Sequence, residues 1–446
     1  MTTFDFSRVG RSRVLIGGYG RAGAAACGLA TRLGAEVTVF EDGRNPPPEG
    51  VQVIDSISGL LEALPAFDLV VVSPGIAPTH PLFADVSKVT SELGFARNFV
   101  DKPLVAITGT NGKTTVTTLV SNMLNAQGLA GVAVGNIGTP LSAHVNDPVS
   151  CFVVEASSFQ LAFTDRLAPA HAAFLNFTPD HLDWHGNMAN YLAAKARIAE
   201  GMEPSGTIWV PRGEARIAGA LDYARAHRHE IPGPDAAVVD DSLRIGGTPV
   251  LGVPELARRF PHDLLNFCFA GSLAMAMGAG QEAIARVIRE FRGLPYRMEK
   301  VGEFGGHQVF DDSKATTPDA VLCDMEALDS AVLIAGGKNK GVDLKPLAAL
   351  APKLRGVVAI GDAAADVAEA FRDTGVRCVV RDSMQGAVES AFSLASSGDA
   401  VILSPGCTSW DWYNSYAERG DDFKARVKAM FDRKSSHEGV PSSAQE

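Results

Sequence analysis

The chain has 446 residues, of which 46% are hydrophobic and 20% are charged, proportions typical of a globular protein with more than one domain. Its formal net charge of −11, with no block of Lys or Arg, argues against nucleic acid as a partner. The N-terminus has no signal-like apolar segment, no apolar run reaches the roughly 18 residues of a membrane span, and the six cysteines are scattered, so we expect a cytoplasmic protein.

Apolar runs typical of buried parallel strands recur along the chain. The expected strands are Val14–Ile16, Val37–Phe40, Leu69–Val72, Leu104–Ile107, Phe152–Val154, Ala172–Phe177, Val332–Ile334, Val357–Ile360 and Ala400–Leu403. Helical periodicity predicts helices at Ala22–Leu33, Thr114–Gln127, Tyr191–Ile198 and Gln281–Phe291. Strands that alternate with helices predict an α/β fold with parallel sheets. We expect three domains, at 1–98, 99–293 and 294–433, and a disordered tail at 434–446.

A first glycine loop, Gly18-x-Gly20-x-x-Gly23, lies between the first strand and the first helix. Its backbone N–H groups can approach a diphosphate at the helix N-terminus, and the acidic pair Glu41-Asp42 follows at the spacing of a ribose contact. The motif permits three interpretations: a dinucleotide cofactor, another diphosphate nucleotide, or a purely structural turn. A further glycine turn at 73–76, after the strand LVVV, favours the second.

A second glycine loop, Gly109-Thr-Asn-Gly112-Lys113-Thr114, follows the strand at 104–107 and opens a helix. Its backbone N–H groups form an anion nest, Lys113 can reach the β- and γ-phosphates, and the Thr114 hydroxyl can bind Mg²⁺. Ile107 stands where the longer form of the motif has glycine, so this is the shorter variant. The loop predicts a nucleoside triphosphate site.

Metal-binding side chains are expected beside this loop. Glu155 ends the strand CFVVE, at the sheet edge where an acidic Mg²⁺ ligand is needed. Acidic and histidine side chains gather at 180–185 after another strand, and there we expect His181 to bind a metal or the substrate. Lys195 lies on an expected helix, and the pattern alone indicates a solvent-facing side chain.

Four polar loops mark the C-terminal region, at 293–299, 311–318, 336–341 and 404–409. The first follows a helix and the other three follow strands. Each alone can be a simple loop. Together they predict a site at the carboxyl edge of a sheet, where Arg297 can neutralise a phosphate and 336–341 offers cations to an anionic substrate.

Ten stretches of the chain resemble the Mur ligases, over nearly its whole length. They read VLIGGYGRAG, SPGIAPTHP, VAITGTNGKTTVTTLV, GNIG, VVEASSFQL, NFTPDHLDWHG, YLAAKARI, GLPYRME, DDSKATTP and SPGCTSWDWYNSYAERGDDF. The most specific of these signals is the combination of Glu-x-Ser-Ser-Phe-Gln with Asp-Ser-Lys-Ala-Thr. In this combination the chain resembles the members of the family that add glutamate.

The resemblance implies an ATP-dependent carboxylate–amine ligase that joins D-glutamate to UDP-N-acetylmuramoyl-L-alanine through an acyl phosphate, in the cytoplasmic stage of peptidoglycan synthesis. It implies a monomer with a Rossmann-like UDP-binding domain, a central P-loop ATPase-type parallel sheet and a C-terminal Rossmann-like α/β domain that binds the amino acid. It also implies two Mg²⁺ ions. Two alternatives stay open: the same ligation with L-glutamate, and a glutamate ligase like folylpolyglutamate synthase, which is not expected to begin with a UDP module.

The resemblance further implies roles for individual residues. ATP would be bound by Gly109, Thr110, Asn111, Gly112, Lys113, Thr114, Thr115, Asn266, Arg297 and Asp312. Mg²⁺ would be bound by Thr114, Glu155, His181 and Lys195, the lysine as a carbamate because an ammonium cannot bind a cation. The UDP substrate would contact Gly20, Arg21, Ala22, Asp42, Gly75, Asn136 and His181, and glutamate would contact Lys314, Thr316, Lys340, Ser409 and Tyr416. The catalytic set would be Lys113, His181, Lys195 and Arg297.

Overall fold

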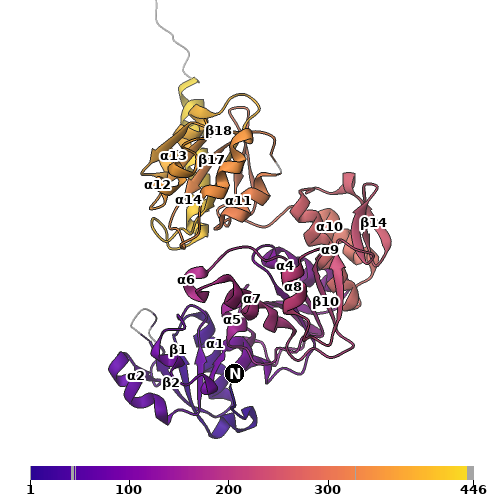
Figure 1. Ribbon diagram of the computed structural model, residues 1–446, viewed down its shortest axis with the longest axis vertical. Coiled ribbons are helices and arrows are strands. Elements are labelled where there is room, and N and C mark those ends of the chain that lie inside the picture. Colours follow the sequence, from indigo (N-terminus) through magenta and orange to yellow (C-terminus); the bar gives the residue numbers. More distant parts are fainter. Residues whose placement is uncertain (1, 42–44, 46, 327, 439–446) are drawn as a thin grey trace, which may run out of the picture. The chain divides into compact units, whose positions relative to one another are not determined.

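The described residues of the chain, 2–41, 45, 47–326 and 328–438, divide into two units in a computed structural model (Figure 1). The first unit comprises Met1–Phe177, Trp184–Ala257 and Asp263–Phe291, and the second comprises Thr178–Asp183, Arg258–His262 and Arg292–Glu446. The first unit contains two separate parallel sheets, one within residues 13–91 and the other within residues 104–231. The division into three domains stays a prediction.

The first sheet has five parallel strands in the order β3-β2-β1-β4-β5. These are β1 (Arg13–Gly17), β2 (Glu36–Phe40), β3 (Gln52–Ile54), β4 (Leu69–Val72) and β5 (Val89–Ser91), with helices α1 (Arg21–Arg32), α2 (Ile57–Ala63) and α3 (Glu92–Arg97). The strand order reverses direction between β1 and β4. In such a doubly wound sheet the loops after these two strands form the ligand site, and they carry both glycine turns of this domain.

The second sheet has six parallel strands in the order β11-β10-β9-β6-β8-β7. These are β6 (Leu104–Thr108), β7 (Gly131–Gly135), β8 (Cys151–Glu155), β9 (His171–Phe174), β10 (Thr207–Pro211) and β11 (His227–Ile231). The accompanying helices are α4 (Lys113–Ala126), α5 (Ser158–Ala162), α6 (Leu182–His185), α7 (Met188–Ala196), α8 (Ala215–Ala220), α9 (Pro261–Ala276) and α10 (Gln281–Glu290). Strand β9 ends three residues before the expected Phe177, because Asn176 leaves the sheet to hydrogen-bond the phosphate loop.

A small antiparallel sheet was not expected from the sequence. It consists of β12 (Ala236–Val239), β13 (Ser242–Ile245) and β14 (Thr248–Gly252). Two-residue turns join its strands, with positive φ at both positions of Asp240-Asp241 and Gly246-Gly247. Such turns match the twist of paired strands, so the Gly-Gly pair was the signal in the sequence for a hairpin.

The second unit is built on a six-stranded sheet in the order β15-β16-β20-β17-β18-β19, parallel except for the β15–β16 pair. Its strands are β15 (Glu299–Phe304), β16 (His307–Asp311), β17 (Ala331–Gly336), β18 (Leu354–Ile360), β19 (Cys378–Arg381) and β20 (Ala400–Gly406). Its helices are α11 (Pro318–Met325), α12 (Ala364–Ala370), α13 (Met384–Leu394) and α14 (Tyr416–Glu438). Helix α14 continues past 434, where a disordered tail was expected, and is described as far as Glu438.

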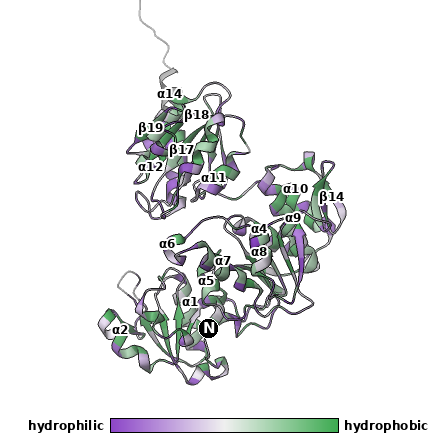
Figure 2. Cartoon of the chain, viewed as in Figure 1, coloured by the Kyte–Doolittle hydropathy of each residue, from purple (hydrophilic) through white to green (hydrophobic). Residues whose placement is uncertain are grey.

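Every expected strand and helix is present, with ends shifted by a few residues. Central strands such as β1, β6 and β17 are buried almost throughout, and Figure 2 shows hydrophobic residues gathered in the sheets of both units. This burial explains why continuous apolar runs predicted the strands. No helix among the described residues combines the length and the hydropathy needed to cross a membrane.

Candidate active site

The phosphate loop connects buried strand β6 to helix α4. Gly109 and Gly112 have φ of +152° and +82°, so the loop uses backbone conformations that favour glycine. A Cβ atom on Gly112 would lie 2.7 Å from Oδ1 of Asn266 on α9, so this predicted ATP residue does lie against the loop. The first N–H groups of α4 and its helix dipole make the loop a site for an anion.

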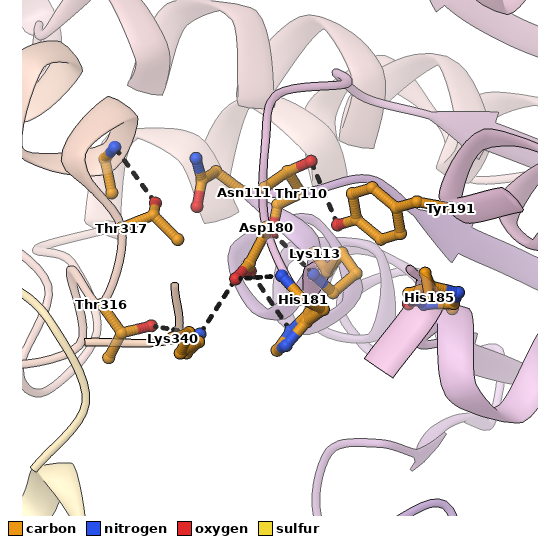
Figure 3. Close-up of polar contacts among 12 residues, drawn as sticks. Thr110, Asn111, Lys113, Asp180, His181, His185, Tyr191, Thr316, Thr317 and Lys340 are labelled. Carbon is orange, nitrogen blue, oxygen red and sulfur yellow. Dashed lines mark hydrogen bonds and ion pairs between the residues drawn. The ribbon is translucent and has the colours of Figure 1, made fainter. Parts of the chain in front are cut away.

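Asn176, which follows β9, fixes the shape of this loop. Its Oδ1 accepts from the N–H of Asn111 at 2.8 Å, and its Nδ2 donates to the Asn111 carbonyl at 3.1 Å. The Thr110 hydroxyl lies 3.3 Å from the Tyr191 hydroxyl (Figure 3). Neither Asn176 nor Tyr191 was predicted as a site residue. The available signal for Asn176 was its position just after the strand neighbouring β6.

Two lysines meet at one carbonyl oxygen of the loop. Nζ of Lys113 donates to the carbonyls of Gly109 and Thr110, both at 2.8 Å, and Nζ of Lys195 donates to the same Gly109 carbonyl at 2.7 Å. Lys195 is only 1% exposed, and its ammonium lies 4.6 Å from the centre of the Tyr191 ring. The solvent-facing position that its helical pattern alone indicated is wrong.

Helix α7 explains this placement. It is rich in alanine and begins at Asn187, whose side chain accepts from the N–H of Asn190 as an N-cap. Tyr191 and Lys195 are four residues apart, so they share one face of the helix, and that face packs on the phosphate loop. A lysine buried beside an anion site is suited to catalysis rather than to solubility.

Glu155, at the end of β8, has the properties of a cation ligand. It is 2% exposed, its Oε1 accepts from Nδ2 of Asn136 at 2.7 Å, and its Oε2 has no hydrogen-bond partner among the described residues. Ser157 and Gln160 form a capping box that ends the strand and starts α5, which holds Glu155 at the sheet edge. A buried carboxylate oxygen lacking a donor fits a hard cation, as does the hydroxyl of Thr114 in the first turn of α4.

The histidines and acids at 180–185 are divided between the two units. His185 is buried in the first unit, with its Nε2 2.9 Å from the Ser158 hydroxyl and its ring stacked on Phe159. Asp180 and His181 belong to the second unit. His185 is the last residue of the short helix α6, and its contacts are those of a structural histidine.

Asp180 is the centre of a polar group in the second unit (Figure 3). Its Oδ2 lies 3.2 Å from Nε2 of His181, and its Oδ1 lies 3.0 Å from Nζ of Lys340. Nζ of Lys340 also donates to the Thr316 hydroxyl at 3.4 Å. The structure therefore brings together two predicted glutamate residues, Lys340 and Thr316, and pairs the lysine with a carboxylate. His181 as a metal ligand stays a prediction.

Other predicted residues of the second unit gather around Tyr416, the first residue of α14. Nζ of Lys314 lies 5.0 Å from the centre of the Tyr416 ring, and the Tyr296 ring packs edge-on against the same ring at 5.8 Å. Tyr296 and Met298, on either side of Arg297, have positive φ, a strained conformation often found at functional sites. Ser409 is 2% exposed.

Asp312 is buried after β16 and accepts hydrogen bonds from the Ser404 hydroxyl at 2.6 Å and from the Met298 N–H at 3.1 Å. Burial, together with the neighbouring carboxyl of Asp324, raises the pKa of Asp312 well above its ordinary value.

Arg419, on α14, is the main residue that the sequence analysis missed. It is 1% exposed, and its Nε and Nη2 donate to the hydroxyl and carbonyl of Ser313 at 2.9 and 2.8 Å. It also donates to the carbonyls of Cys407 and Thr408, both at 3.0 Å. Burial lowers the pKa of the Arg419 guanidinium to about 10. One side chain thus joins the loop at 311–318 to the loop at 404–409.

The glycine turns of the first sheet are joined to one another. The Ser73 hydroxyl donates to the Gly18 carbonyl at 3.1 Å, and a Cβ on Gly23 would lie 1.8 Å from that oxygen. Glu41 accepts from the Tyr19 N–H at 2.6 Å, so this member of the acidic pair supports the loop itself. Asp42 lies outside the described residues.

Four further predicted UDP residues lie at these turns. A Cβ on Gly20 or Gly75 would meet nothing within 4 Å, which leaves room for a ligand. Arg21, in the first turn of α1 beside Ala22, donates to the Gly138 carbonyl at 3.4 Å, two residues from Asn136. The first glycine loop is thereby connected to the loop that contacts Glu155.

Comparisons with known proteins match this architecture. A model of the Mur ligase middle domain matches residues 107–230, and one of the Mur ligase glutamate ligase domain matches 296–407. The chain is 36% identical to a UDP-N-acetylmuramoylalanine–D-glutamate ligase of Desulfitobacterium hafniense, over 94% of this chain and 98% of that one. It is 37% identical to the enzyme of the same name from Pelotomaculum thermopropionicum, over 96% and 99%. The fold resembles MurF ligase of Thermotoga maritima in complex with ADP, with a TM-score of 0.59 at 16% identity over 94% and 95% of the two chains.

Two glycines offer a matched test of the phosphate loop. Gly112→Ala and Gly128→Ala each place an L-residue at positive φ, +82° and +87°, and each should cost about 1–2 kcal/mol of folding stability. Only the Gly112 variant adds an atom against Asn266, since a Cβ at Gly128 meets nothing within 4 Å. We expect Gly112→Ala to weaken ADP binding at least ~10-fold in calorimetry, and Gly128→Ala to bind ADP like the wild type. Equal affinities would contradict a nucleotide site at this loop.

Arg419→Lys should keep the charge but lose the planar set of donors that joins the two loops. We expect a lower melting temperature and a KM for the amino-acid substrate raised about 10-fold, with nucleotide affinity unchanged. Arg426→Lys, on the exposed side of α14, is the control and should stay within about 0.5 kcal/mol of wild-type stability with an unchanged KM. A purely structural Arg419 would lower the melting temperature and leave the KM unaltered.

Proposed function

The chain belongs to the Mur ligase family, and we propose on that basis that it joins D-glutamate to UDP-N-acetylmuramoyl-L-alanine with ATP, in the cytoplasmic stage of peptidoglycan precursor synthesis. The observation that supports this most directly is the match, over 94–96% of this chain, with relatives that carry the name of this activity. The geometry of the phosphate loop and of the Lys340 region supports the same chemistry. We expect the protein to act as a monomer.

The first half of the proposed reaction is phosphoryl transfer. The N–H groups of the phosphate loop and Lys113 hold the β- and γ-phosphates, and Arg297 neutralises charge on the group transferred. A carboxylate oxygen of the muramoyl-alanine attacks the γ-phosphorus, the bond to the bridging oxygen breaks, and ADP leaves. Mg²⁺, when bound by Thr114 and Glu155 and at a second site by His181 and a carbamate of Lys195, supplies further positive charge.

The second half forms the amide. The neutral amine of D-glutamate attacks the carbonyl carbon of the acyl phosphate, inorganic phosphate leaves with the bonding electron pair, and the nitrogen loses a proton. Lys340, Thr316 and Ser409 bind the glutamate carboxylates in this proposal. The pairing of Lys340 with Asp180 at 3.0 Å supports this role, because a carboxylate of the substrate can take the place of the Asp180 carboxylate at the same ammonium group.

In the same proposal the first sheet binds the UDP part of the substrate rather than NAD. Glu41 is already engaged by the Tyr19 N–H, which removes one acidic candidate for the ribose contact of a dinucleotide. Arg21 places a positive charge beside the glycine loop, suited to a diphosphate. A glutamate ligase that acts on folates is not expected to contain a UDP-binding module.

The proposal is tested by supplying UDP-N-acetylmuramoyl-L-alanine and ATP with either enantiomer of glutamate, and identifying the product by mass spectrometry and chiral hydrolysis. We expect the amide product and ADP to form with D-glutamate and not with L-glutamate. A Lys113→Ala variant that retains its fold should form neither product. Product with L-glutamate alone would replace the proposed substrate. ADP formation only with a pteroate-type acceptor would assign the chain to the folate reaction.

Lys195 should carry a carbamate in the working enzyme. Its amine lies buried beside the phosphate loop, and carbamylation converts it into an oxygen ligand for Mg²⁺. We expect Lys195→Ala to lose about 100-fold or more of kcat while folding normally, with Lys195→Arg no better, because a guanidinium does not carbamylate. Lys428→Ala, which removes an exposed helical lysine, should be fully active.

A carbon-13 spectrum recorded with labelled bicarbonate should show the carbamate in the wild type and not in Lys195→Arg. Full activity of Lys195→Ala, or a wild-type spectrum with no such signal under turnover conditions, would contradict the carbamate.

A further inference from the structure

Three metal-binding groups of different kinds converge in the second unit, outside the residues assigned to ligation. A ring nitrogen of His262, the Sγ atom of Cys323 and a carboxylate oxygen of Asp324 all lie within 4.8 Å of one another. His262 is in the first turn of α9, and the other two are in the last turn of α11. We propose that these three side chains form a binding site for Zn²⁺.

The spacing suits this ion. Zn–N and Zn–O bonds of about 2.0–2.2 Å in a tetrahedral site put neighbouring ligand atoms about 3.3–3.6 Å apart. Nδ1 of His262 and Oδ1 of Asp324 lie 3.4 Å apart, already one edge of that polyhedron. The Sγ atom of Cys323 lies within 4.8 Å of the other two ligand atoms, which puts it beside this edge. The His262 and Asp324 side chains are 20% and 19% exposed, so an ion reaches them from solvent.

The ligand types select the metal. Thiolate and imidazole bind borderline and soft cations, whereas Mg²⁺ and Ca²⁺ take oxygen ligands. Three protein ligands leave one position of the tetrahedron for water, as in zinc sites that are not purely structural. Excess Mg²⁺, which the ligase reaction needs, should therefore not occupy this site.

Neighbouring groups hold two of the ligands in place. The ring of Phe260 packs against His262, with the ring centres 5.6 Å apart. The Arg258 guanidinium lies 4.8 Å from the centre of the Phe260 ring and donates to the Met298 carbonyl at 2.9 Å. The buried carboxyl of Asp312 contacts Asp324. Such outer contacts orient metal ligands and strengthen binding.

The position gives the site a role. His262 ends the segment Arg258–His262 of the second unit, and the residues on either side of it, Ala257 and Asp263, belong to the first unit. A metal bound by His262, Cys323 and Asp324 would tether this connecting segment to α11. The inference is independent of the amino acid used in ligation, and it makes Zn²⁺ a ligand that acts on the connection between the units.

The test uses Co²⁺ as a spectroscopic substitute for Zn²⁺, added to the full chain in excess Mg²⁺. A thiolate-to-cobalt charge-transfer band should appear and saturate at one equivalent, and Zn²⁺ should displace it. Cys323→Ser should abolish the band, His262→Gln should weaken Zn²⁺ binding at least ~100-fold in competition with a chelating dye, and the control Cys378→Ser should change neither.

Binding should also raise the melting temperature of the wild type and of Cys378→Ser, and not that of Cys323→Ser. Absence of a charge-transfer band in the wild type would overturn the site. A band that survives in Cys323→Ser would overturn it as well, since the thiolate would then come from another cysteine. If a folded His262→Gln variant kept full Zn²⁺ affinity, His262 would not be a ligand, and the proposed tether would be wrong.

Discussion

Two ammonium groups donate to one carbonyl oxygen, that of Gly109, and the site depends on this contact. The hydrogen bonds of 2.8 and 2.7 Å place Nζ of Lys113 and Nζ of Lys195 no more than 5.5 Å apart. At that separation two unit charges repel by about 3 kcal/mol at the effective dielectric of a protein. An anion at the loop offsets this repulsion, as does conversion of one amine to a carbamate. The contact therefore supports a triphosphate at the loop and a carbamate on Lys195, which both stay proposals.

The surrounding structure serves to hold that contact. Gly109 and Gly112 allow the turn, Asn176 fixes the backbone of Asn111 from the neighbouring strand, and the Tyr191 ring lies beside the ammonium of Lys195. In the second unit Arg419 has a comparable function for the loops at 311–318 and 404–409, because it donates to carbonyls on both of them from a third element. Preorganisation of this kind lets a site bind charge with little rearrangement.

Much of this architecture could be predicted from the sequence, because continuous apolar strands and glycine turns are local signals. The phosphate loop and Glu155 were predicted from their positions at the ends of buried strands. Lys195 was interpreted wrongly from its pattern, since periodicity alone does not say which face of α7 meets a neighbour. Arg419 and Asn176 were missed because their partners lie 106 and 65 residues away in the chain. The segment Thr178–Asp183 follows a strand of the first unit yet belongs to the second, which no local pattern reveals.

The proposed reaction depends on transfer of a phosphoryl group from ATP to the carboxylate of the UDP-linked substrate, followed by amide formation. Isotope transfer tests that step most directly. UDP-N-acetylmuramoyl-L-alanine labelled with oxygen-18 in its free carboxylate would be ligated to D-glutamate, and the inorganic phosphate analysed by mass spectrometry. An acyl phosphate predicts one labelled oxygen in each phosphate released per amide formed. Phosphate that contains no label, with the amide formed at the same rate, would contradict the mechanism.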